Sequence, residues 1–145
     1  MGRIVETLLG GVIDYAGMFP PAALDLDTAQ ANYERYRRGP QGWLLGRFVV
    51  RVADLERAGA IPRLSVVVDR EIPALPDTVE SLETTWGGLP AIAGLEVYHE
   101  IPLDRRPIPD RAKIRLGGER VASAESLARF LVDARVPFKA TAGLH

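Results

Sequence analysis

The stretch RLSVVVD, residues 63–69, decides the fold class of this 145-residue chain. Its apolar and β-branched residues run without interruption, whereas a strand with one solvated face alternates apolar and polar residues. Such a run is typical of a strand in a parallel sheet that is covered on both faces. The sequence therefore predicts a buried parallel strand here.

Strands and helices alternate outward from this stretch. Further strands are expected over 46–52, 92–100, 112–116 and 138–142. Helices are expected over 4–9, over 28–38 after an Asp27 N-cap, over 53–59, after an Asp77–Glu80 capping box, and after Ser123. The connection over 98–112 is rich in proline, so it is either an extended loop or a change of strand direction. The alternation predicts an α/β fold with a mostly parallel sheet of about five strands.

The domain is expected to span 1–145, with a helical or lid segment over 1–42 followed by strand–helix repeats over 43–145. Five strands are too few to close a (β/α)₈ barrel, which needs about 250 residues. The expected architecture is therefore partial and TIM-barrel-like.

Composition excludes several classes of function. The net charge of −1 provides no broad field for nucleic acid or anionic membranes, and the absence of cysteine excludes disulfides and thiolate chemistry. No apolar run approaches a membrane span, and the first residues do not form a signal peptide. We expect a cytoplasmic protein without nucleic-acid or membrane partners. No nucleotide-binding fingerprint is present, and no cofactor is predicted.

Charge recurs on one face of the expected strands, because successive strand side chains point to opposite faces. Lys113 and Arg115 share one face of their strand, and Lys139 and Thr141 share one face of theirs. Arg51 and Glu96 likewise stand opposite apolar neighbours. Repeated charge is costly beneath covering helices, so the pattern favours a barrel-like interior.

This charged face predicts a site for a small carboxylate or phosphate. A desolvated lysine beside other cations can attack a carbonyl as a neutral amine and form a Schiff base. Lys139 is the expected nucleophile, Lys113 is the neighbouring cation that favours the neutral amine, and Glu96 is the third catalytic candidate. The expected substrate-binding residues are Arg115, Arg51, Thr141, Gly117, Gly118 and Gly143, whose glycines bring backbone N–H groups within reach of an anion.

Two structural interpretations stand beside this one. The charges can pair across strands, Glu96 with Lys113 or Arg115, or the charged face can simply meet water. No metal is predicted. Glu96, His99, Glu100 and Asp69 form the alternative metal set, and such ligands suit Mg²⁺ or Mn²⁺.

Three stretches carry a resemblance to a known family. DYAGMFPPAAL (14–24), WLLGRFVV (43–50), and AKIRLGG (112–118) with VPFKATAGLH (136–145) resemble an uncharacterised bacterial protein family. Its members continue past the final histidine, which implies that this chain is a short or truncated member.

A looser similarity links the two lysine-bearing strands to class I deoxyribose-phosphate aldolases. That similarity implies that Lys113 forms the Schiff base and that Lys139 tunes it, the reverse of the assignment made from the residues alone. Arg115 and Leu116 depart from the aldolase pattern. The resulting hypothesis is a lyase or aldolase-like enzyme, or a binder of a small anionic metabolite. The alternative is a non-catalytic assembly domain that forms homo-oligomers.

Overall fold

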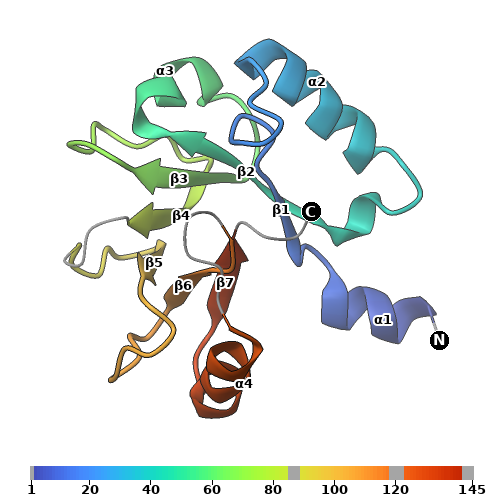
Figure 1. Cartoon of the computed structure of the whole chain (residues 1–145). Coiled ribbons are helices and arrows are strands. Elements are labelled where there is room, and N and C mark those ends of the chain that lie inside the picture. The colour runs from blue at the N-terminus through green and yellow to red at the C-terminus, as the bar shows by residue number, and fades with distance from the viewer. Residues whose placement is uncertain (1, 85–88, 118–122, 142–145) are drawn as a thin grey trace. The chain divides into compact units, whose positions relative to one another are not determined.

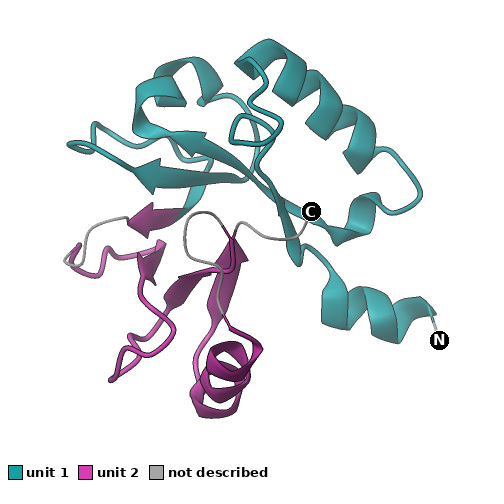
Figure 2. Ribbon diagram, in the orientation of Figure 1, with its two compact units in different colours: residues 1–81 teal, residues 82–145 magenta. Residues whose placement is uncertain are grey.

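The chain has an α/β fold with a parallel sheet, as the sequence predicts. The structure is a computed structural model, and it describes residues 2–84, 89–117 and 123–141. Two compact units divide the chain, residues 1–81 and 82–145 (Figure 2). Each unit is described by itself below.

Over residues 2–78, the first unit contains three strands, three α-helices and two short 3₁₀ helices. In chain order these are α1 (Gly2–Leu9), β1 (Ile13–Tyr15), α2 (Leu26–Arg37), η1 (Gly42–Leu44), β2 (Leu45–Arg51), η2 (Val52–Asp54), α3 (Leu55–Ala58) and β3 (Leu64–Val68). Figure 1 labels the strands and the α-helices. The pairs β1–β2 and β2–β3 are both parallel. Strand β4 (Val79–Thr84) begins in this unit and ends in the next.

The second unit continues the sheet with β5 (Glu96–Glu100), β6 (Ala112–Arg115) and β7 (Phe138–Thr141), and with helix α4 (Ala124–Asp133) between β6 and β7. The pairs β5–β6 and β6–β7 are parallel. The strand direction is therefore kept across the proline-rich connection, where residues 101–111 form an extended loop. Each strand from β1 to β7 neighbours the next one in the chain.

The expected count of five strands was wrong, because the sheet has seven strands within the residues that the structure describes. Strand β1 is three residues long and lies within a stretch that its glycines and prolines mark as a loop. Strand β4 occupies the segment in which Asp77 and Glu80 suggested a capped helix. The strand is buried along nearly its whole length, so both of its faces are covered and no apolar–polar alternation distinguishes it from a helix in the sequence.

The helix caps were predicted in part. Ser123 caps α4, accepting a hydrogen bond from the Ser126 backbone N–H at 3.1 Å. Helix α2 begins two residues earlier than expected, because Asp25 and not Asp27 is its N-cap. One Asp25 carboxylate oxygen accepts from the Thr28 backbone N–H at 2.9 Å, and the other accepts from the Thr28 hydroxyl at 2.7 Å.

Each unit has its own apolar core. In the first, alternate residues of β2 and β3 are fully buried with Tyr33 of α2, whose hydroxyl donates to the Gly46 carbonyl at 2.6 Å. In the second, Ala112 and Ile114 of β6 pack with Phe130 of α4 and Ile101. The helix covers one face of β6, and the opposite face is left for polar residues.

Candidate functional site

The polar face of the second unit is built by strand alternation on four successive strands. It carries Glu83 of β4, Glu96, Tyr98 and Glu100 of β5, Lys113 and Arg115 of β6, and Lys139 and Thr141 of β7. We call Glu83, Glu100, Lys113 and Lys139 the lysine site. The structure thus places Lys113, Arg115 and Lys139 of the predicted cluster on one face of the second unit.

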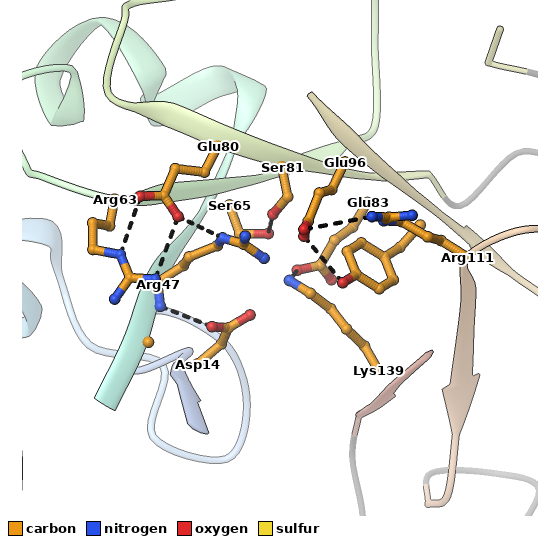
Figure 3. Close-up of polar contacts among 12 residues, drawn as sticks. Asp14, Arg47, Arg63, Ser65, Glu80, Ser81, Glu83, Glu96, Arg111 and Lys139 are labelled. Atoms are coloured by element: carbon orange, nitrogen blue, oxygen red, sulfur yellow. Dashed lines mark hydrogen bonds and ion pairs between the residues drawn. The ribbon is translucent and has the colours of Figure 1, made fainter. Parts of the chain in front are cut away.

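The two lysines share one carboxylate. Lys113 and Lys139 are register partners on adjacent strands. The Lys113 Nζ lies 3.2 Å from one carboxylate oxygen of Glu83. The Lys139 Nζ donates to the other oxygen at 2.9 Å, and Figure 3 shows Lys139 beside Glu83. Only 5%, 12% and 3% of the Lys113, Lys139 and Glu83 side-chain surfaces are exposed. This carboxylate therefore bridges two cations in a nearly dry environment.

The two lysines differ in their other neighbours. The Lys113 Nζ also lies 3.3 Å from a carboxylate oxygen of Glu100, which in turn binds Arg115 at 3.3 Å. The Lys139 Nζ lies 4.8 Å from the centre of the Tyr98 ring, within the range of a cation–π interaction. Lys113 is thus held between two carboxylates, while an aromatic face lies beside the more exposed Lys139.

Glu96 belongs to a separate polar group on the same face, which it forms with Tyr98 and Arg111. It accepts a hydrogen bond from the Tyr98 hydroxyl at 3.1 Å, and Arg111 lies 3.7 Å away (Figure 3). The expected pairing of Glu96 with Lys113 or Arg115 was wrong, since both of those residues pair with Glu100. Glu100 lies four residues further along β5 and on the same face, so alternation alone could not choose between the two acids.

The residues predicted to bind the substrate do not all lie in one unit of the chain. Thr141 is the register partner of Arg115, and its hydroxyl donates to the Ile114 carbonyl at 3.3 Å. Gly117 is buried just after β6. Arg51 ends β2 in the first unit. Gly118 and Gly143 lie outside the described residues.

Within residues 2–84, 89–117 and 123–141, no three His, Asp or Glu side chains gather as metal ligands. Alternation places His99 on the face of β5 opposite Glu96 and Glu100. Asp69, in the first unit, pairs with Arg70 at 3.6 Å.

Glu83, the residue that joins the two lysines, was not among the predicted site residues. The signal was present, because Val79, Ser81 and Glu83 alternate along one strand face. It was hidden by the helix predicted for the same residues.

Lysine is rare in this chain, and its use is confined to this site. Of the 18 basic residues, 16 are arginines and two are lysines. The two lysines are register partners on β6 and β7, Lys113 buried and Lys139 half-buried. Arginine stays charged in proteins, whereas a lysine amine can lose its proton and act as a nucleophile. The chain thus has lysine, the basic residue whose amine can become a nucleophile, only at the two positions that contact Glu83.

Comparison with known proteins gave no match to a family model, to a curated protein or to a solved structure. In the described part of the chain, none of the helices has the length and apolar character that crossing a membrane requires.

Proposed function

We propose that the lysine site forms a Schiff base with a small carbonyl compound that carries an anionic group, as in a lyase or aldolase-like enzyme. The observation that carries this proposal is the position of the chain's two lysines, which share Glu83 in a nearly dry environment. Burying ionic groups that apolar side chains could replace gives little net stability. Ionisable groups in such surroundings are frequent in functional sites.

Lys139 is the proposed nucleophile. It is the more exposed of the two amines, and its contacts include an aromatic ring. Lys113 is assigned the role of the neighbouring cation, because two carboxylates flank it at 3.2 and 3.3 Å. This assignment agrees with the one made from the residues alone and differs from the one that the aldolase similarity implies.

Glu83 is placed to move the proton. Its oxygen, 2.9 Å from the Lys139 Nζ, can accept the proton that frees the amine. The amine then adds to the carbonyl carbon to give a carbinolamine. Glu83 returns the proton to the carbinolamine hydroxyl, which leaves as water, and a protonated imine remains on Lys139.

The surrounding charges favour an anionic substrate. Four cations (Lys113, Lys139, Arg111 and Arg115) face three carboxylates (Glu83, Glu96 and Glu100), which leaves one positive charge. Arg115 is exposed and in register with Thr141, so these two residues are proposed to contact the anionic group.

Borohydride trapping tests this proposal directly, because the chain offers two ε-amines and one α-amine. Cyanoborohydride would be added at neutral pH with pyruvate, glyoxylate or dihydroxyacetone phosphate, and the adduct mapped by mass spectrometry. We expect Lys139 to be modified before the α-amine. Lys139→Arg should abolish the adduct, and Lys113→Arg, which keeps the charge, should retain it at Lys139. Modification of the α-amine first with every probe would contradict the proposal.

Assembly is a second candidate function, and helix α1 favours it. This helix has no buried residue, and its Ile4 and Leu8 are 67% and 75% exposed. Large exposed apolar side chains on one helix face are characteristic of a contact surface. If α1 mediates self-association, light scattering over a dilution series should give an oligomer that Ile4→Glu/Leu8→Glu converts to a monomer. A monomeric wild-type chain would exclude this function.

A further inference from the structure

The first unit contains an arginine whose surroundings differ from those of its counterparts. Among the described residues, three arginines are half-buried: Arg47, Arg51 and Arg111. Arg47 hydrogen-bonds to Glu80 at 2.9 Å, and Arg111 lies 3.7 Å from Glu96. Arg51 has no acidic partner in that part of the chain, and its contact is with an aromatic ring.

That ring is Phe19, from the loop that follows β1. The guanidinium carbon of Arg51 lies 4.3 Å from the centre of the Phe19 ring. Such stacking stabilises the cation but uses only one flat face of the guanidinium. The N–H donors lie in the guanidinium plane, so they remain available at its edge.

The position of Arg51 also suits a ligand. It is the last residue of β2, at the carboxyl end of a strand that pairs in parallel on both sides. Ligands of parallel α/β sheets bind at this end. Asp69, beyond the end of the neighbouring β3, pairs with Arg70 at 3.6 Å.

We propose that Arg51, held flat by Phe19, binds an oxyanion, a carboxylate or a phosphate, at the carboxyl end of β2. A half-buried guanidinium keeps its charge at any pH in the physiological range, so an anion is the chemistry that complements it. Its planar fork matches two oxygens of one oxyanion. This site does not depend on the chemistry of the two lysines.

The test is an NMR titration of the arginine Nε–Hε resonances in the full chain, with inorganic phosphate and with acetate as separate probes. Arg51→Lys assigns the Arg51 signal by its loss. We expect that signal to shift saturably with at least one probe, and Phe19→Leu to weaken the affinity about threefold. Saturation by phosphate alone would assign a phosphate group, and saturation by both probes a general oxyanion.

The matched control is Arg57, an exposed arginine of α3 that pairs with Asp27 at 3.6 Å. Its Nε–Hε signal should move only linearly with ionic strength. Equal, linear shifts at Arg51 and Arg57, or no shift at Arg51, would overturn the proposal. An unchanged anion affinity in a folded Phe19→Leu variant would show that Phe19 does not position Arg51 for binding, and would overturn the proposed site.

Discussion

Strand β4 carries two glutamates that are each flanked by two cations, but the two clusters differ in chemistry. Glu80 lies in the first unit between Arg47, at 2.9 Å, and Arg63, at 3.1 Å (Figure 3). Glu83 lies in the second unit between Lys113 and Lys139. The Glu80 side chain is 36% exposed and the Glu83 side chain 3%.

The difference shows which cluster can do more than hold strands together. Arginines do not release protons in proteins, so the Glu80 cluster can stabilise the sheet but cannot supply a nucleophile. The Glu83 cluster pairs its carboxylate with amines and excludes most water, which strengthens every charge interaction in it. The two clusters thus share one arrangement, a glutamate between two cations, and only the Glu83 cluster contains amines.

The largest expected effect is on stability. Glu83→Gln leaves two buried ammonium groups without their shared carboxylate and should lower the free energy of unfolding by about 3 kcal/mol or more. Glu80→Gln, the matched change in the more exposed cluster, should cost at most about 1 kcal/mol. Urea denaturation of both variants measures the difference. Equal losses would remove the distinction between the clusters.

Replacing the whole buried triad should restore most of that loss. Lys113→Met/Glu83→Met/Lys139→Met removes the desolvation cost of all three charged groups together with their mutual attraction. Its free energy of unfolding should fall within about 1 kcal/mol of wild type or above it, because buried ion pairs are often no better than apolar packing. The same denaturation experiment checks this, and borohydride trapping should be lost. A triple variant as unstable as Glu83→Gln would assign the cluster a structural role.

Substitution of Tyr98, whose ring lies beside the Lys139 amine, should have a smaller effect on stability. Tyr98→Leu removes the ring beside the ammonium group and should cost about 1 kcal/mol beyond the change in packing. Tyr98→Phe keeps the ring and removes only the hydroxyl that donates to Glu96, so it should cost about 1 kcal/mol or less. The trapping rate at Lys139 separates the two variants, since only Tyr98→Leu should change it. A change of the rate in Tyr98→Phe would instead place the hydroxyl in the reaction.

The smallest expected effect is the pH dependence of the Glu80 cluster. Burial alone would raise the pKa of Glu80, but hydrogen bonds from Arg47 and Arg63 outweigh it and hold the pKa below its ordinary value of 4.5. A lowered pKa in the folded state adds stability above the unfolded-state pKa, and that stability is lost as pH falls through the folded value. We expect less than about 1 kcal/mol because Glu80 and Arg63 are partly exposed to solvent, which screens the interaction. The urea midpoints of wild type and Glu80→Gln should differ at neutral pH and become equal below about pH 4, where Glu80 is protonated in wild type.

The sequence predicted which strand faces carry the two lysines, but it did not predict Glu83, the carboxylate between them. Alternation on β6 and β7 correctly grouped Lys113 with Arg115 and Lys139 with Thr141, because side-chain direction in a strand follows from position alone. It could not identify Glu83, since the Asp77–Glu80 capping pattern predicts a helix over the residues that form β4. Nor could it choose between Glu96 and Glu100, which share a face of β5 and differ only in register.

The sequence by itself determined the α/β class, the parallel strands and the restriction of lysine to two positions. These properties follow from local periodicity and composition, which each segment carries without its neighbours. The tertiary structure decided that VESLET is a strand, that Lys113 faces Lys139, and that one buried carboxylate joins them. Register and pairing depend on which strands meet, and only the packed sheet fixes that.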